Sequence, residues 1–236
     1  MDDIDGTDGL DGLDSADGTD GTDGTDGTDG IVNPAPAPSR TEVLLIGGRA
    51  GVGKTTVGWE ISDRLREAAV AHAILEGDYL GQVHPAPPGD PHRSAVTEAN
   101  LTAVWGTYAA LGHRRLVYTN TVSVLPDSAP MFERALGPGV RIIRVLLTAT
   151  DTTTLTRLTA REIGSALDRE LAGSARKSRL LDAHSPPDTV RVATDDRTVG
   201  DIAAEVLAVT GWMATDTVAT GAGEAGAGQP DRARPR

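Results

Sequence analysis

Residues 42–55 read EVLLIGGRAGVGKT, an apolar run followed by glycines and a lysine. The run Val43–Ile46 is continuous rather than alternating, which predicts a strand buried on both faces of a sheet. Residues 48–55 match the pattern G-x-x-x-x-G-K-[ST] at every fixed position, and the sequence after them has the periodicity of an amphipathic helix. A strand, a glycine-rich loop and a helix in this order predict that backbone N–H groups converge on bound phosphates.

The residue types in this loop suit a nucleoside triphosphate. Glycines at positions 48, 51 and 53 let the backbone approach an anion in conformations that a Cβ would disfavour. Lys54 is expected to neutralise the β- and γ-phosphate oxygens, and the hydroxyl of Thr55 is expected to bind Mg²⁺. We therefore predict ATP and Mg²⁺ as cofactors. The residues predicted to bind them are Gly48, Arg49, Ala50, Gly51, Val52, Gly53, Lys54, Thr55 and Thr56.

Strand and helix patterns alternate through the rest of the middle of the chain. Helices are predicted over Thr55–Ala69, Ala95–Leu111, Ala129–Leu136, Asp151–Asp182 (in pieces broken near Gly164 and Gly173) and Val199–Val209. Strands are predicted over His72–Leu75, Arg115–Tyr118, Val140–Leu147 and Thr189–Val192. The alternation predicts an α/β fold with a parallel sheet covered on both faces and a ligand at the carboxyl ends of its strands. The aromatic residues expected in its core are Trp59, Trp105 and Tyr108.

The two ends of the 236-residue chain differ in composition from its middle. Residues 1–39 consist of Thr-Asp-Gly triplets followed by a Pro- and Ala-rich linker, and residues 213–236 are rich in Ala, Gly, Thr and Pro. Neither end can bury a core, so both are predicted to be disordered, with a weak calcium-binding segment as the alternative for the acidic repeat. Residues 40–212 are therefore predicted to form the single folded domain.

The formal net charge of −12 comes from the acidic end of the chain. Residues 2–29 hold eleven Asp and no basic residue, whereas the middle holds 20 acidic and 19 basic residues. This balance argues against a nucleic-acid partner. The chain has no cysteine, which excludes disulfides and thiolate metal sites. It begins with Asp and Gly rather than a basic segment and has no apolar stretch near the roughly 18 residues of a membrane span, so we expect a cytoplasmic protein that does not bind membranes. A monomer or small homo-oligomer is expected.

Two carboxylates follow the second predicted strand. The chain there reads Leu75-Glu76-Gly77-Asp78-Tyr79. A carboxylate at this point lies at the same carboxyl edge of the sheet as the glycine-rich loop if the second strand neighbours the first. Asp78 is predicted to accept the proton of an attacking hydroxyl and to help position Mg²⁺ through water, with an ordinary turn Asp as the alternative. Glu76 is interpreted either as an outer-shell group of Mg²⁺ or as a surface acid.

Missing motifs argue against two other classes of nucleotide-binding protein. Guanine-specific switches use Asn-Lys-x-Asp, but the chain has only Lys54 and Lys177, and neither lies in such a motif. Mechanical ATPases place an acid at the end of a hydrophobic strand, but two of the predicted strands end in Thr119-Asn120 and Thr148-Ala149. A GTPase or a mechanical ATPase is therefore disfavoured.

The loop, the Glu-Gly-Asp sequence and an Arg-rich segment after the fourth predicted strand resemble the small P-loop kinases of the nucleoside-monophosphate-kinase-like group. That group includes adenylylsulfate, gluconate and shikimate kinases and chloramphenicol phosphotransferase. The resemblance covers residues 42–211. It implies a three-layer P-loop NTPase domain with a five-stranded parallel sheet in order 2-3-1-4-5, an acceptor site within residues 79–111 and a helical lid within residues 157–179. The implied activity is transfer of the γ-phosphoryl group of ATP to a small-molecule or nucleotide acceptor.

The resemblance also implies roles for arginines. Arg157 and Arg161, four residues apart, are predicted as catalytic groups that close over the triphosphate, with Arg176 and Arg179 as further lid residues. Solvated or ion-paired helix arginines are the alternative. Arg197 matches the position where the group holds the nucleotide base, although Asp196 or Thr198 in that segment suits a helix cap equally well.

The acceptor and the turnover stay open. His84 and His92 flank a Pro-rich loop and are interpreted either as metal ligands or as surface residues. Because the strand-end acid of mechanical ATPases is missing, a non-catalytic ATP-binding regulatory module is kept as an alternative to a kinase. A slow hydrolase is the third hypothesis.

Overall fold

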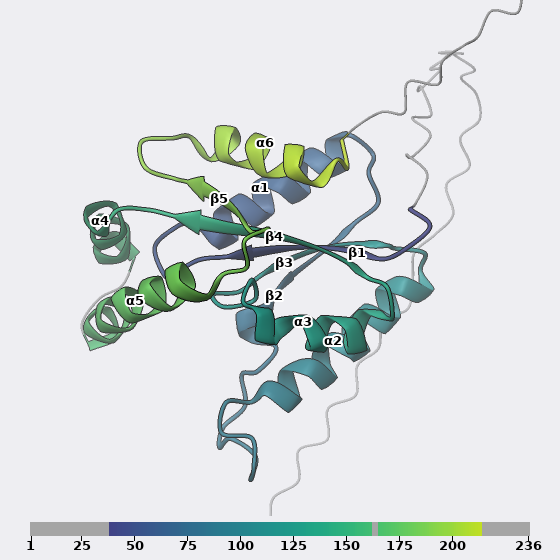
Figure 1. The fold of residues 1–236 in the computed structure, drawn as a ribbon, viewed down its shortest axis with the longest axis horizontal. Helices are drawn as coiled ribbons and strands as arrows, with labels where there is room; N and C mark the ends of the chain where they lie inside the picture. Colours follow the sequence, from purple (N-terminus) through teal and green to yellow (C-terminus); the bar gives the residue numbers. More distant parts are fainter. Residues whose placement is uncertain (1–37, 162–164, 214–236) are drawn as a thin grey trace, which may run out of the picture. The chain divides into compact units, whose positions relative to one another are not determined.

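A sheet of five parallel strands forms the centre of the protein (Figure 1). The computed structural model describes residues 38–161 and 165–213, without the side chains of residues 161–172. The strands are β1 Glu42–Gly47, β2 Ala73–Glu76, β3 Arg115–Thr119, β4 Arg141–Thr148 and β5 Val190–Ala193. They lie in the order β2-β3-β1-β4-β5, which confirms the predicted order. The tails predicted to be disordered lie outside the described residues, apart from residues 38, 39 and 213.

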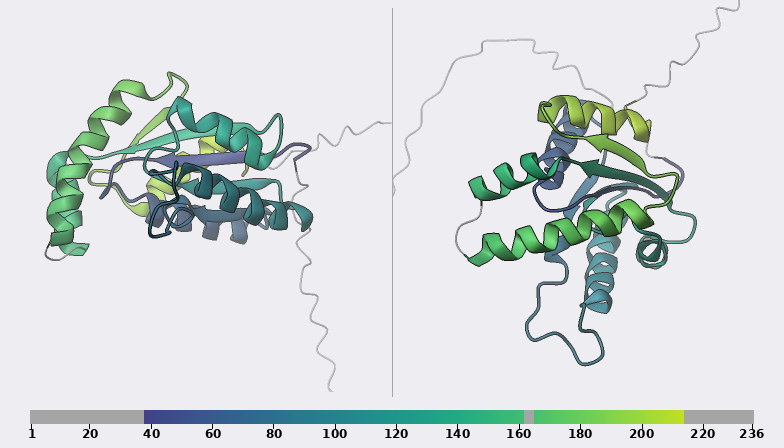
Figure 2. Two further views of the ribbon diagram at one scale, coloured as in Figure 1. Left: turned by 90° about the horizontal axis from the view of Figure 1, so that it is seen from below. Right: turned by 60° about the vertical axis from the view of Figure 1, so that its left-hand side comes forward.

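Helices cover both faces of this sheet. They are α1 Lys54–Glu67, α2 Ser94–Ala110, α3 Ala129–Leu136, α4 Asp151–Arg161, α5 Ser165–His184 and α6 Val199–Thr210, with two short 3₁₀ turns, η1 Gly77–Tyr79 and η2 Pro126–Ser128. Helices α1 and α6 pack side by side on one face, and α2 and α3 pack on the other (Figures 1 and 2). Helices α4 and α5 lie at the carboxyl ends of the strands (Figure 2). Within the described ranges, no helix has the length and apolarity needed to span a lipid bilayer.

The core lies on both sides of β1, as its apolar run predicts. All six residues of the strand are buried. Leu44 and Ile46 belong to the cluster that includes the apolar faces of α1 and α6, whereas Val43 and Leu45 belong to the cluster shared with α2 and α3. Successive side chains of a strand point to opposite faces, so a strand covered on both sides must be apolar at every position.

The expected aromatic core is correct only in part. Trp105 is 3% exposed and Tyr108 packs against the same cluster, but Trp59 is 48% exposed, so its assignment to the core was wrong. Helix α1 buries Val57 and Ile61. Trp59 comes two positions after Val57 and therefore lies on the opposite side of a helix with 3.6 residues per turn.

The predicted helix break at Gly173 is also wrong. Helix α5 continues through this residue from Ser165 to His184. Glycine inside a helix costs only about 1 kcal/mol relative to alanine, which the rest of a 20-residue helix outweighs. The break expected near Gly164 falls at residues 162–164, which lie outside the described residues.

Alanine at Gly77 is expected to destabilise the fold by about 1 to 3 kcal/mol. A Cβ there would overlap the ring and hydroxyl of Tyr118, which is 1% exposed and packs edge-on against Phe132. Denaturant unfolding of the full chain measures the effect. The control is Gly106→Ala in α2, where a Cβ meets no heavy atom within 4 Å, so the free energy of unfolding should stay equal or rise. Equal stability of the two variants would contradict the prediction.

Candidate active site

The glycine-rich loop encloses an open cradle at the start of α1. Gly51 and Gly53 have φ angles of +86° and +94°, and a Cβ at Gly53 would meet no heavy atom within 4 Å. Gly48 N donates a hydrogen bond to the carbonyl oxygen of Thr121 at 3.1 Å, which fixes the loop against the segment after β3. The start of α1 has no side-chain cap. Its first N–H groups are therefore available to an anion.

This cradle opens into a cavity of about 360 Å³ between the loop, the end of β2 and α5. It is called the phosphate cavity below. Its lining residues are Ala50, Gly51, Gly53, Lys54, Thr55, Thr56, Asp78, Gln82, Thr121 and Lys177. Both lysines of the chain therefore lie at one cavity, although the sequence holds twenty arginines. An ammonium group is a compact point charge that suits phosphate oxygens.

The side chain of Arg49 fixes the loop through contacts outside the phosphate cavity. It is buried, and its guanidinium pairs with Asp151 at the start of α4 and donates to the carbonyl oxygen of Ala149 at 2.7 Å. The carbonyl oxygen of Arg49 accepts a hydrogen bond of 3.2 Å from Nζ of Lys54. Three residues of the predicted phosphate-binding set 48–56 do not line the phosphate cavity: Gly48, Arg49 and Val52. Any contact of Arg49 with a ligand there has to come from its main chain.

Glu76 joins the loop to the sheet beside the phosphate cavity. Its Oε2 accepts hydrogen bonds from Oγ1 of Thr55 at 3.2 Å and from Oγ1 of Thr119 at 2.7 Å. Its Oε1 is buried and has no hydrogen-bond partner among the described residues. A carboxylate with one orphan oxygen next to the Thr55 hydroxyl is an oxygen donor set that fits Mg²⁺. A role of Glu76 as an outer-shell group of Mg²⁺ fits these contacts and stays a prediction.

Asp78 lies where the phosphate cavity meets a second hollow. This acid in η1 is exposed, and its Oδ1 accepts a hydrogen bond of 2.6 Å from Nδ2 of Asn120 at the end of β3. The amide of Asn120 is itself fixed, because its Oδ1 accepts from the backbone N–H of Val122 at 3.0 Å. Asp78 is therefore oriented by the neighbouring strand. Sequence reasoning missed Asn120, although its position directly after a strand next to β2 was a usable signal.

The second hollow has a volume of about 560 Å³ and is called the acceptor cavity below. It lies between η1 and the start of α2. Its lining residues are Gly77, Asp78, Gly81, Gln82, Val83, His84, His92, Arg93, Thr97 and Asn120. Asp78 and Gln82 line both cavities. Among the described residues no cluster of three or more His, Cys, Asp or Glu side chains could hold a metal, so the metal interpretation of His84 and His92 gains no third ligand.

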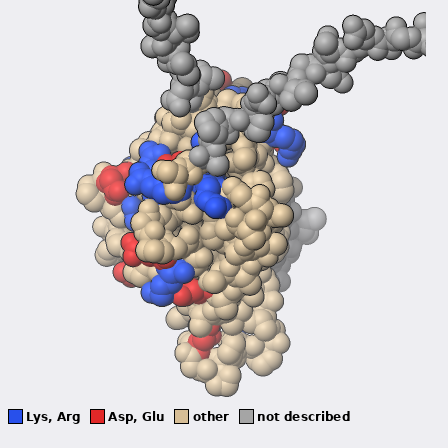
Figure 3. All heavy atoms as spheres, turned by 90° about the vertical axis from the view of Figure 1, so that its right-hand side faces the viewer, with Lys and Arg blue, Asp and Glu red and all other residues tan. Residues whose placement is uncertain are grey.

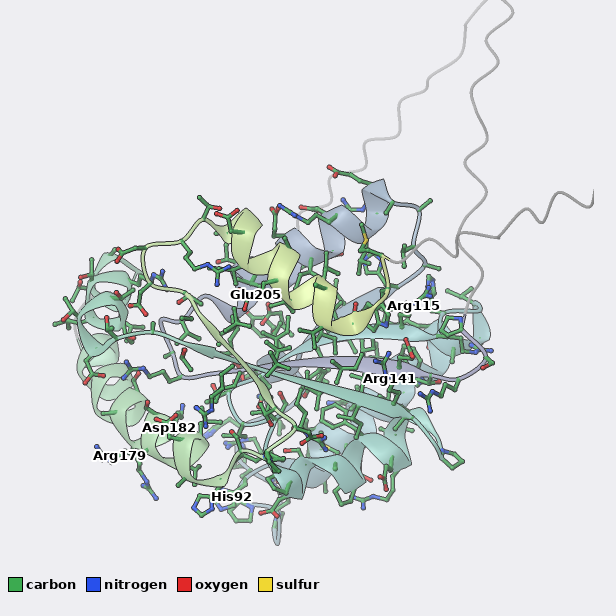
Figure 4. All side chains as sticks on the ribbon, turned by 45° about the horizontal axis from the view of Figure 1, so that its top comes forward. His92, Arg115, Arg141, Arg179, Asp182 and Glu205 are labelled. Atoms are coloured by element: carbon green, nitrogen blue, oxygen red, sulfur yellow. The ribbon has the colours of Figure 1, made fainter. Side chains whose placement is uncertain are left out.

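Helix α5 presents a lysine rather than an arginine to the phosphate cavity. Oγ of Ser174, which is buried, donates to the carbonyl oxygen of Ala50 at 3.4 Å, so α5 packs directly on the loop. One turn later Lys177 lines the phosphate cavity. Arg176 and Arg179 are exposed, and Figure 4 shows Arg179 pointing outward from the helix. The resemblance directed attention to arginines, and therefore Lys177 was missed.

Of the two arginines predicted as catalytic, Arg157 has a described side chain and Arg161 does not. Arg157 in α4 donates to Oγ1 and to the carbonyl oxygen of Thr194 at 2.9 and 2.8 Å, and it reaches the carbonyl oxygen of Gly51 at 3.4 Å. It therefore ties α4 to the end of β5 and to the loop, and it is not among the residues that line the phosphate cavity. The side chain of Arg161 lies outside the described residues. A catalytic role of either arginine stays a prediction.

The segment after β5 is fixed by ion pairs and hydrogen bonds to α6 and to the end of β5. Arg197 pairs with Glu205 of α6 at 2.7 Å and donates to the carbonyl oxygen of Ala193 at 3.0 Å. Hydrogen bonds from Thr153 and Thr150 lower the pKa of Asp195 to about 2. Thr198 caps α6, because its hydroxyl accepts from the N–H of Asp201 at 3.1 Å. Binding of a nucleotide base by Arg197 stays a prediction.

The edge of the sheet opposite the two cavities has a different character. Arg115 and Arg141 lie at this amino-terminal edge, far from His92 and α5 (Figure 4). Figure 3 shows this face as mostly uncharged surface, with basic and acidic side chains in a few small groups. The groups suited to phosphate chemistry therefore gather at the carboxyl edge of the sheet.

Comparisons with known proteins bear on the fold. No protein-family model matches this chain. No curated protein matches it either. Among solved structures, the tunicamycin resistance protein of Deinococcus radiodurans is 18% identical, with 73% of this chain and 96% of that chain covered at a TM-score of 0.51. A sugar kinase from Janibacter sp. HTCC2649 is 16% identical, with 75% and 99% covered at a TM-score of 0.50.

Similarity at these identities establishes architecture and not activity. The sheet order and the neighbours together confirm the predicted three-layer α/β fold and its resemblance to the small P-loop kinases.

Proposed function

We propose, from the premise that this chain has a P-loop kinase fold, that it transfers the γ-phosphoryl group of ATP to a hydroxyl of a small acceptor. The observation that carries this proposal is the position of Asp78, whose side chain lines both the phosphate cavity and the acceptor cavity. A base at that junction can contact a hydroxyl on one side while the donor lies on the other.

The donor is held by the loop and the start of α1. The uncapped N–H groups at the start of α1 and the N–H groups around Gly51 and Gly53 bind phosphate oxygens, and Lys54 neutralises their charge. The hydroxyl of Thr55 would bind Mg²⁺, and Glu76 as an outer-shell group and Asp78 through water would help to position it. Bound Mg²⁺ supplies charge neutralisation on the transferring phosphoryl group.

Asp78 accepts the proton of the acceptor hydroxyl as that oxygen attacks. Its Oδ1 is engaged by Asn120, which leaves Oδ2 for the substrate. Asn120 is a positioning residue, since it acts through Asp78. Proton removal by an oriented carboxylate typically contributes about 10² to 10⁴ in rate.

The regulatory alternative rested on the missing acid at the end of a strand next to the loop. Glu76 ends β2, which is separated from β1 by β3, but its Oε2 accepts a hydrogen bond from the Thr55 hydroxyl at 3.2 Å and so places a carboxylate beside the loop from one strand further away. This contact favours turnover over sensing. ADP formation by the full chain, compared with and without a panel of hydroxyl acceptors, tests the proposal: stimulation by one acceptor supports a kinase, and equal rates with every acceptor contradict it.

Lys177→Ala is expected to lower kcat by about 10- to 100-fold, because a cation that faces the phosphates stabilises charge in the transition state. Lys177→Arg should retain more activity than the alanine variant. Steady-state ATP turnover with a saturating acceptor measures both. The matched control on the same helix is Arg179→Ala, whose exposed side chain points away from the site (Figure 4). A control variant as impaired as Lys177→Ala would overturn this role for the lysine.

A further inference from the structure

We infer that the acceptor is an anionic hydroxyl compound, one that carries a carboxylate or a phosphate group besides the hydroxyl that is phosphorylated. The inference rests on the proposed function and adds the chemical class of the second substrate. The acceptor cavity has a built-in polarity that supports it. Asp78 and Gln82 line its side toward the phosphate cavity, whereas His84, His92 and Arg93 line the acceptor cavity alone.

Arg93 is the fixed positive charge of this cavity. Eight other arginines of the described part of the chain form ion pairs with carboxylates, and they are Arg49, Arg64, Arg66, Arg134, Arg141, Arg144, Arg191 and Arg197. Within the described ranges Arg93 is among the arginines without such a partner, and it is the only arginine that lines either cavity. Asp78 is the only acidic side chain among the described residues that line the acceptor cavity with it. A cation that the fold leaves unneutralised at a cavity is suited to an anionic group of a ligand.

The guanidinium of Arg93 is also positioned. Its Nε donates to the carbonyl oxygen of Val83 at 2.7 Å, which closes the loop between η1 and α2 and leaves both terminal nitrogens for a ligand. Two terminal nitrogens of one guanidinium match the paired oxygens of a carboxylate or phosphate. The start of α2 does not supply this anion site, because the carboxylate of Asp90 already accepts from the N–H groups of Ser94 and Ala95 at 2.7 and 3.0 Å.

The remaining lining excludes other acceptor classes. Val83 is the one aliphatic side chain among the ten described lining residues, and the other side chains are polar or absent. A flat apolar acceptor would gain little buried apolar contact here. A polycationic acceptor would meet Arg93 as a like charge. A cavity of about 560 Å³ accommodates a small hydroxy acid or a phosphorylated sugar or nucleoside.

The test uses compounds paired by charge on the full chain with MgATP: D-glycerate against glycerol, gluconate against sorbitol, and glucose 6-phosphate against glucose. Binding is measured by calorimetry with a slowly hydrolysed ATP analogue, and transfer is measured as ADP formation. In at least one pair the anionic member should bind with a Kd below about 10 mM and at least about tenfold more tightly than its neutral counterpart.

Arg93→Gln should raise the KM, or the Kd, for that anion at least about tenfold while kcat changes less, and Arg93→Lys should fall between it and the unaltered protein. His92 also lines the acceptor cavity, so His92→Gln should weaken binding of the anion as well. This substitution leaves the hydrogen bond between Arg93 and Val83 in place, so the test does not depend on one variant. Arg66→Gln, an exposed arginine in α1, is the control.

The outcomes separate this inference from the proposed function. Arg93-dependent binding of an anion without transfer supports the anion site and overturns the kinase proposal. Transfer to a neutral or cationic compound, with no preference for its anionic counterpart and no effect of Arg93→Gln, keeps the kinase and overturns the anionic acceptor. The acceptor class is also overturned if no anionic compound binds.

Discussion

Alanine at Lys54 is expected to weaken MgATP binding by at least about 100-fold, which corresponds to about 2.7 kcal/mol, and to abolish turnover. Lys54 is the cation of the glycine-rich loop, and its Nζ lies at the phosphate cavity within 3.2 Å of the carbonyl oxygen of Arg49. Charge-assisted hydrogen bonds to phosphate oxygens are about twice as strong as neutral ones, and Lys177 is the only other basic residue among the described residues that line this cavity.

Calorimetry with MgATP measures this effect. The control is Arg66→Ala on the same helix, whose exposed side chain pairs only with Asp63, so its affinity for MgATP should stay unchanged. Tight MgATP binding by the Lys54 variant would contradict the assignment of residues 48–55 as a phosphate-binding loop.

Asparagine at Asp78 is expected to lower kcat by about 10² to 10⁴ while the Kd for MgATP changes less than about threefold. The substitution keeps the shape of the side chain and an oxygen that can accept the hydrogen bond from Asn120, so the loss reports the missing base rather than a rearranged site. Single-turnover kinetics and equilibrium binding on the same variant give the two values.

Asp127→Asn in η2, an exposed acid away from both cavities, serves as the matched control. An ATP-binding regulator would show little change in either quantity for Asp78→Asn. That result would exclude Asp78 as the catalytic base and favour the regulatory alternative.

Most of the fold follows from local patterns in the sequence. The continuous run Val43–Ile46 requires cover on both faces, and the glycine-rich loop after it requires a helix, so β1 and α1 were predictable from residues 42–67. The order of the strands was not, because parallel neighbours are set by packing between distant segments; the predicted order came from the resemblance. Trp59 was misplaced because periodicity identifies a helix more reliably than it identifies the buried face.

The site was predictable where its residues adjoin the ends of strands. Lys54, Thr55 and Asp78 follow β1 and β2, and the rule that ligands bind at the carboxyl edge of a parallel sheet places them together. Asn120 and Lys177 meet them only through tertiary packing. The Asn120 contact with Asp78 joins residues 42 positions apart, and Lys177 is brought to the loop by a helix that packs through a buried serine.

Transfer of phosphate to an acceptor is the central claim, and its product is the most direct measurement. The full chain is incubated with MgATP and an acceptor that stimulates ADP formation, and ³¹P NMR follows ATP, inorganic phosphate and the phosphorylated acceptor. We expect a phosphomonoester of the acceptor in a 1:1 ratio to ADP, and its loss in Asp78→Asn. Inorganic phosphate in place of the phosphomonoester, at the same rate in both proteins, would contradict it.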